Sequence, residues 1–204
     1  MSHNRYSMSF TTGGLFHRES VKVAELYLML GDWSAARDDV IGKNILQART
    51  MNSLKRVCRE VISRLKTLRD EELGFLIEAN HQVQGQILWI AVCRRYKFIA
   101  EFAVEVLRER YMALKTDLSF QDFDSFLNRK SEWHSEVDKI RPVTRNKLRQ
   151  VLFRMLREAD LLTTNNNIKA AMLSPRLMDI IFNGNCRDIL YFPAYESDLK
   201  GIKK

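Results

Sequence analysis

The 204-residue sequence is poor in glycine, proline and cysteine, and it contains no long apolar run. Its 8 glycines and 3 prolines are too few for an architecture of short strands and tight turns, which favours helices. The 3 cysteines, Cys58, Cys93 and Cys186, show no CxxC or CxH spacing, and their odd number, together with the lack of a secretory signal, predicts a cytoplasmic protein with reduced thiols. The most apolar stretch, "ILWIAVC", has 7 residues, whereas a bilayer span needs about 20. We therefore expect a soluble protein that does not insert into a membrane.

Catalytic and metal-binding patterns are also missing. The 4 histidines, His3, His17, His81 and His134, are scattered, and none stands at helical ligand spacing from another. The stretch "TTGGLF" lacks the frame of a phosphate-binding loop, and the carboxylates of "DFDSF" and "DEE" have no partnered base or nucleophile. We expect a protein that is not an enzyme and that needs no cofactor or metal.

Apolar residues recur at helical spacing through most of the chain. The clearest stripe occupies residues 53–68, and residues 84–114 are apolar on nearly all sides, as in the buried centre of an all-α protein. No linker or repeat interrupts the chain. The sequence therefore predicts an all-α or nearly all-α compact multi-helix globule, with residues 1–204 in a single domain and a partly irregular N-terminus over residues 1–18.

Residues with strong positional preferences mark the ends of these helices. Gly31 is a typical C-terminal stop, and we expect four N-terminal caps, at Asp32, Ser119, Thr144 and Ser174. Pro175 suits the first position of the last helix. The cap at Thr144 predicts a helix that runs to about residue 159.

The segment "SEVDKI", a break at Pro142 and the cationic helix after it together resemble a helix-turn-helix, whose second helix enters the DNA major groove. The next stretch, "LLTTNNNIKAAML", can form two short strands about an asparagine turn, where a winged helix carries its hairpin. We therefore expect a winged-helix-like subregion over residues 141–183 with a short wing hairpin near residues 161–173. An ordinary helix followed by a surface connection remains the alternative.

Positive charge gives the main functional indication. The sequence has 33 Lys and Arg against 25 Asp and Glu, a net charge of +8. Residues 49–69 include seven basic residues, among them Arg64, and one acid, Glu60, while residues 141–157 include six basic residues and no acid before Glu158. A solvated helix face usually mixes signs, so two helices without acids suggest a surface for a polyanion. The proposed nucleic-acid contacts are Lys55, Arg56, Arg59, Lys66, Arg141, Arg145, Lys147, Arg149, Arg154 and Lys169.

Three readings of these charges remain open. The cations can bind double-stranded DNA through its phosphates, dock an acidic protein, or simply keep helix faces solvated. Binding to structured RNA is a further alternative to binding duplex DNA.

Several stretches resemble the BrxA family, the small A component of bacterial BREX (bacteriophage exclusion) defence systems. They run in the same order over about residues 9–177: "SFTTGGLFHRES", "VAELYLMLGDW", "QARTMNSLKRVCREVISRLKTL", "LWIAVCRRYKFIAEFAVEVLRERY", "DFDSFLNRKSEWH", "TRNKLRQVLFRMLREADLL" and "LSPRL".

This resemblance implies a small helical protein that works beside a site-specific DNA methyltransferase, an ATPase and other large components, which mark host DNA and block phage replication. The family has been likened to the RNA-binding antitermination factor NusB, and its members were sometimes labelled membrane proteins, for which this sequence offers no span. The family supplies no catalytic motif that could be assigned to residues of this sequence. The resemblance also does not indicate which residues contact nucleic acid.

Overall fold

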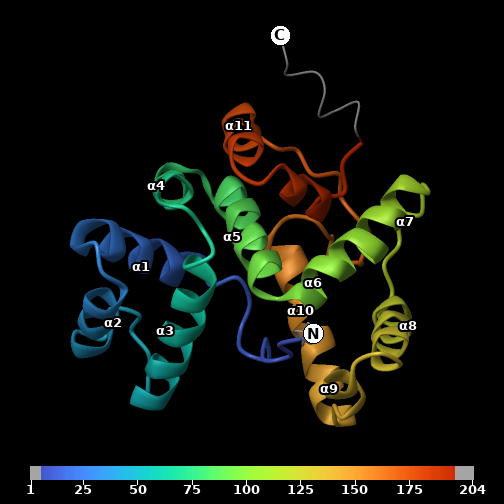
Figure 1. Cartoon of the computed structure of the whole chain (residues 1–204), viewed down its shortest axis with the longest axis horizontal. Helices are drawn as coiled ribbons and strands as arrows, with labels where there is room; N and C mark the ends of the chain where they lie inside the picture. The colour runs from blue at the N-terminus through green and yellow to red at the C-terminus, as the bar shows by residue number, and fades with distance from the viewer. Residues whose placement is uncertain (1–5, 196–204) are drawn as a thin grey trace.

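The structure is a computed structural model that describes residues 6–195, and every regular element in that part of the chain is a helix. The prediction of an all-α fold is therefore confirmed, and Figure 1 shows the arrangement. The elements in chain order are α1 (His17–Leu30), α2 (Trp33–Gly42), α3 (Met51–Leu65), α4 (Asp70–Glu78), α5 (His81–Arg95), α6 (Lys97–Phe102), the π-helix η1 (Ala103–Arg108), α7 (Glu109–Met112), α8 (Phe120–Ser131), α9 (Ser135–Asp138), α10 (Pro142–Glu158), α11 (Pro175–Asn183) and the 3₁₀-helix η2 (Cys186–Tyr191).

Helix α5 forms the centre of the fold. From Val83 to Cys93 every residue except Gln84 is buried, which agrees with the apolar composition of this segment. The helix contacts α1, α3, α4, α6, α10 and η2, and one cluster of buried apolar side chains extends from Tyr6 to Phe192. Figure 1 shows α1–α4 on one side of α5 and α6–α10 on the other.

Local sequence signals place most helix ends correctly. Gly31 ends α1 at φ +68°, a left-handed conformation that glycine adopts readily, and its N–H donates to the Tyr27 carbonyl. The carboxylate of Asp32 accepts the N–H of Ala35, and the Ser119 and Ser174 hydroxyls accept the N–H groups of Asp122 and Leu177. These three caps are confirmed.

The expected cap at Thr144 is wrong. Helix α10 begins at Pro142, and Arg141, three residues before Thr144, occupies the cap position without a side-chain hydrogen bond. The fixed φ of proline suits the first helical position, where the missing N–H has no partner within the helix in any case. Pro142 therefore starts the helix instead of only ending the segment before it.

The expected pair of strands at residues 161–173 is also wrong, although the chain does reverse direction there. Two isolated bridges, Leu162 with Ile168 and Asp117 with Asn167, replace the strands, and Asn166 takes the left-handed conformation at φ +62°. Leu161, Leu162 and Ile168 are buried, so the hairpin contributes its apolar side chains to the core instead of extending as a free wing.

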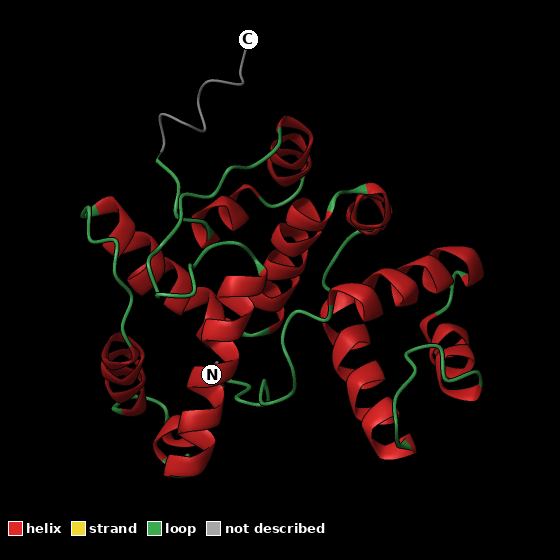
Figure 2. Cartoon of the chain, turned by 180° about the vertical axis from the view of Figure 1, so that it is seen from behind, coloured by secondary structure: helices red, strands yellow, loops and turns green. Residues whose placement is uncertain are grey.

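An irregular N-terminal strap, residues 6–16, connects parts of the chain that are distant in sequence. The N–H of Tyr6 donates to Glu136 at 2.7 Å, and the N–H of Leu15 donates to the Glu158 carboxylate at 2.5 Å. In Figure 2 this strap runs between α3 and α10. It holds the ends of these two helices together at the middle of the molecule.

Candidate nucleic-acid interface

The region around α10 combines several helices with one short extended stretch that pairs with the hairpin. A helical segment (α6, η1 and α7) is followed by an extended stretch at residues 116–118, then by α8, α9, α10 and the hairpin. The extended stretch pairs with the hairpin, because the N–H of Ile168 donates to Thr116 and the N–H of Leu118 donates to Asn166. The segment SEVDKI, expected as the first helix of the helix-turn-helix, forms only the four-residue α9 before α10.

Four of the proposed cations in this region are bound to carboxylates. Arg145 Nε and Arg149 Nη1 donate to the two oxygens of Asp124 on α8, at 2.9 and 2.6 Å. Arg154 donates to Glu158 one turn further along α10, and Lys169 forms an ion pair with Asp160. Arg154 and Lys169 thus each have a carboxylate of their own, whereas Arg145 and Arg149 share one.

Arg141 and Lys147 differ from these four. Both are exposed, and neither has a carboxylate partner among residues 6–195. Lys147 belongs to a stripe of exposed α10 side chains at positions 143, 146, 147, 150 and 154, which fall within about 100° of arc at about 100° per residue. This stripe faces away from the buried Leu148, Leu152 and Met155.

The predicted cations of α3 form a second surface. Lys55, Arg56, Arg59 and Lys66 are all exposed and have no ion-pair partner in the described part of the chain. No acidic side chain on α3 lies among them except Glu60, which is bound to Arg64. The four cations therefore keep their full charge toward solvent.

Arg64 does not belong to this surface, although it is one of the basic residues in the α3 sequence. Its side chain is 3% exposed, donates to Glu60 and to the Gly14 carbonyl, and lies over the rings of Phe16 and Tyr96. Burial, with the hydrogen bond to Glu60, raises the pKa of Tyr96 to about 12. Arg64 thus fixes the strap to α3 and is not available to a ligand.

The cations of α3 and those of α10 lie on two helices that extend away from the strap and from each other. In Figures 1 and 2 the first turns of both helices lie at the lower edge of the molecule, well apart. Nine of the ten proposed cations thus lie on or next to two separate helices, α3 and α10, and the tenth, Lys169, lies in the hairpin after α10. The structure brings Arg145 and Arg149 together on Asp124, and it places the α3 cations elsewhere.

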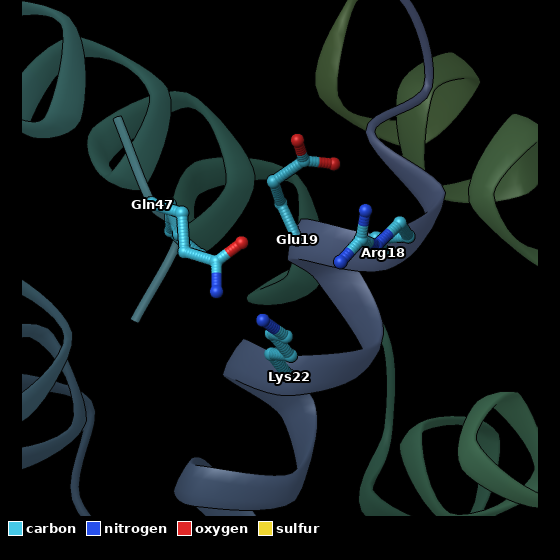
Figure 3. A pocket seen from close by; sticks show the side chains of 5 residues that line it. Arg18, Glu19, Lys22 and Gln47 are labelled. Carbon is cyan, nitrogen blue, oxygen red and sulfur yellow. The ribbon is translucent and has the colours of Figure 1, made fainter. Parts of the chain in front are cut away.

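Two hollows flank the first turns of α1. One, of about 190 Å³, is lined by Arg18, Glu19, Lys22, Leu46 and Gln47, and Figure 3 shows Lys22 and Gln47 facing each other across it. Lys22 donates to the Ile45 carbonyl at 3.0 Å, which holds its ammonium at this side of the hollow.

The second hollow, of about 390 Å³, lies between the strap, α1 and the end of α10. There the rings of His17 and His81 stack with centroids 4.1 Å apart. Burial, and next the neighbouring His81, lowers the pKa of His17, so that its imidazole is neutral near pH 7. None of the proposed cations lines the first hollow, whereas Arg154 of the α10 stripe lines the second, which therefore adjoins the candidate interface.

Among residues 6–195, no group of three or more His, Cys, Asp or Glu side chains is placed to bind a metal ion. His3 lies outside the described residues. No helix in the described part combines the length and apolar character that a bilayer span requires.

Sequence reasoning missed the neutral members of the α10 stripe, Val143, Asn146 and Gln150, because it weighed charge alone. Their spacing of three and four residues, on the face opposite the apolar positions of the same helix, is the signal that finds them.

Comparison with known proteins gives consistent matches. The family model for BrxA matches residues 4–184. The BREX protein BrxA of Escherichia coli O9:H4 (strain HS) is 26% identical over 180 residues, covering 87% of this chain and 84% of that protein. The BREX protein BrxA of Paramagnetospirillum magneticum (strain ATCC 700264 / AMB-1) is 25% identical over 191 residues, covering 91% of this chain and 94% of that protein.

A solved structure shares the fold. The crystal structure of an uncharacterized protein from Magnetospirillum magneticum superposes with a TM-score of 0.80 at 22% sequence identity, over 93% of this chain and 98% of that chain. Together with the family match over nearly the whole sequence, these similarities agree with the resemblance seen in the sequence. The chain belongs to the BrxA family.

Proposed function

We propose that this protein is a non-catalytic component of a BREX phage-defence system that binds double-stranded DNA in the cytoplasm. Membership of the BrxA family supports the BREX assignment, since the relatives carry the name BREX protein BrxA. In such a system the methyltransferase and the ATPase are the expected protein partners. DNA is the substrate on which all these components would meet.

The observation that carries the DNA-binding proposal is a set of exposed cations without internal partners. Lys55, Arg56, Arg59 and Lys66 on α3, and Arg141 and Lys147 at α10, have no carboxylate among residues 6–195 to neutralise them. Like charges on one helix face repel each other, so such a surface is destabilising unless an anion covers it. Phosphates of a duplex supply that anion and release the counterions that they previously held.

The arrangement around α10 adds geometric support. In a helix-turn-helix the second helix lies in the major groove. Here α10 follows the short α9 after a break at residues 139–141, and it presents an exposed face without free acids. The four paired cations, Arg145, Arg149, Arg154 and Lys169, contribute less, because a phosphate must first displace their carboxylates.

A titration of the purified protein with a labelled duplex at two salt concentrations tests the proposal. Six phosphate contacts predict a loss of affinity on the order of 10³-fold between about 50 and 200 mM salt. Two multiple variants then measure how much each helix contributes to the affinity for DNA. The first carries Lys55→Glu, Arg59→Glu and Lys66→Glu on α3. The second carries Arg141→Glu and Lys147→Glu at α10. Each variant should weaken binding and flatten the salt dependence.

A matched control reverses three exposed cations elsewhere that have no ion-pair partner in the described part of the chain, Lys115, Lys139 and Arg187, each to Glu. It makes the same change in net charge as the α3 variant and should bind nearly as well as the original chain. If affinity is indifferent to salt, or if the control loses as much as the α3 variant, the proposed surface is wrong.

A protein adaptor is the second candidate, and the separation of the two surfaces favours it for α3. An acidic face of another BREX component would fit Lys55, Arg59 and Lys66 equally well. Capture of the methyltransferase or the ATPase from nuclease-treated extract, lost in the α3 variant, would assign that surface to a protein. Stronger competition by structured RNA than by duplex DNA would assign it to RNA.

A further inference from the structure

The exposed stripe of α10 contains the side chains that discriminate between bases. Its members Val143, Asn146, Lys147 and Gln150 are all exposed, and Val143 at 81% is unusually open for an apolar residue. Asn and Gln can each donate to and accept from the major-groove edge of adenine, Lys can donate to guanine, and apolar methyl groups contact the thymine methyl. A helix face that bound phosphates alone would need only cations.

The stripe is held rigidly in place. Behind it, Leu148, Leu152 and Met155 are fully buried, which fixes the axis and rotation of α10. On the flank, Arg145 and Arg149 bind Asp124, which fixes α10 against α8. A recognition surface needs this kind of support, because base readout depends on placing donors and acceptors within a fraction of an ångström.

The side chain of one stripe residue, Asn146, is also held in one orientation by a hydrogen bond. Arg149 donates to Asp124 through Nη1 and to Asn146 Oδ1 through Nη2, at 2.6 and 3.2 Å. This chain of contacts turns the Asn146 amide to a fixed direction while its NH₂ group remains unpaired in the described part of the molecule. The orientation costs Asn146 its freedom before any ligand arrives, which lowers the entropy lost on binding.

We propose that this stripe reads base edges in the major groove, so that the protein binds duplex DNA with a sequence preference that includes adenine. The inference rests on the proposed DNA-binding function and adds selectivity to it. From Val143 to Gln150 the helix rises about 10 Å, which matches about three base pairs. The preference should therefore be confined to about three or four adjacent base pairs, with adenine read by Asn146 and Gln150.

Selection from a pool of random duplexes by the purified full-length protein tests this inference. The enriched duplexes should share a short adenine-containing core, bound at least about 10-fold more tightly than a scrambled duplex. In the Asn146→Ala, Gln150→Ala double variant this preference should vanish, while affinity for the scrambled duplex changes less than about threefold. Replacing Gln121, an exposed amide on α8, by Ala is the matched control and should leave the preference intact.

The outcomes separate the two proposals. Salt-dependent binding without enrichment of any sequence overturns base reading and leaves the DNA-binding function standing, and so does a preference that survives in the double variant. Failure to bind any duplex at low salt overturns both. Because the stripe side chains are exposed, unchanged thermal unfolding of the variants should show that lost preference does not reflect lost folding.

Discussion

Asp124 on α8 and Arg149 on α10 lie 2.6 Å apart, and the same carboxylate also binds Arg145. One acid therefore holds two cations that would otherwise face a ligand, and it offsets one of their two charges. The acid is only partly buried, with 30% of its side chain exposed, so a phosphate can compete with it.

Replacing Asp124 by Asn should release both arginines. We expect a higher affinity for duplex DNA at low salt, and a steeper salt dependence by about 0.9 logarithmic units for each freed cation that reaches a phosphate. Stability should fall by about 1 kcal/mol, since partly exposed ion pairs contribute little. Binding curves at several salt concentrations measure the first effect and chemical unfolding measures the second. Unchanged affinity would show that the two arginines never meet DNA.

Substitution of Arg64 and of Arg56 should distinguish a cation of α3 that stabilises the fold from one that binds DNA. Arg64→Met removes a buried partner of Glu60 and should cost about 3 kcal/mol of unfolding free energy, without weakening DNA binding below its unfolding temperature. Arg56→Met removes an exposed cation, so it should change stability by less than about 0.5 kcal/mol and weaken binding. Both variants need thermal unfolding and a duplex titration under the same conditions; the reverse pattern would contradict this division.

Arg94 joins two buried carboxylates, Glu72 and Asp188, at 2.7 and 2.6 Å, and should make stability depend on pH. Burial tends to raise the pKa of Glu72, but hydrogen bonds from Arg94 and the Arg69 N–H hold it below its usual value. Its stabilising contribution is therefore present above pH ~4.5 and is lost as pH falls through the lowered pKa of the folded state. Burial raises the pKa of Asp188 in the folded state, so ionisation of this group lowers stability as pH rises from its ordinary value through the raised one.

Arg94→Met should cost about 3 kcal/mol near pH 7, because both carboxylates remain buried without their cation. Their pKa values then rise, so protonation relieves the variant and its deficit should shrink as pH falls from about 7 to 4. Urea unfolding across this range measures the deficit. Arg95→Met is the neighbouring control, since Arg95 contacts the Tyr96 ring and no described carboxylate, and its small deficit should not vary with pH. A constant deficit for Arg94→Met would refute this account.

Two glycines should respond in opposite directions to alanine. A Cβ on Gly14 would lie 2.1 Å from the Glu158 carboxylate, so Gly14→Ala must displace the hydrogen bond from Leu15 and should cost about 1–3 kcal/mol. Gly74 lies inside α4 with open space at its Cβ position, so Gly74→Ala should gain about 0.5–1 kcal/mol. Thermal unfolding of the two single variants is sufficient, and a neutral Gly14→Ala would show that Glu158 does not hold the strap.

The sequence predicts the helices well because their signals are local. Apolar spacing defines the buried α5, and cap residues such as Asp32 and Ser174 act within three positions of themselves. The error at Thr144 has the same origin, since Pro142 and Thr144 are both good starting residues and only packing decides between them.

The state of the cations could not be predicted in this way. Asp124 precedes Arg145 and Arg149 by 21 and 25 residues, and the strap that covers Arg64 is 50 residues away from it. Whether a cation faces solvent or a carboxylate depends on such distant neighbours, which a helical pattern does not reveal. The uncovered cations of α3 and the stripe on α10 became distinguishable from the paired ones only in three dimensions.

The strap also constrains the order in which a newly made chain can fold. Tyr6 and Leu15 leave the ribosome early, yet their hydrogen-bond acceptors, Glu136 and Glu158, are synthesised 130 and 143 residues later. Helices α1–α4 can associate during translation, whereas the strap must wait until Glu136 and Glu158 have been made. The N-terminal segment therefore docks late, and shortening it should leave a helical but incompletely closed body.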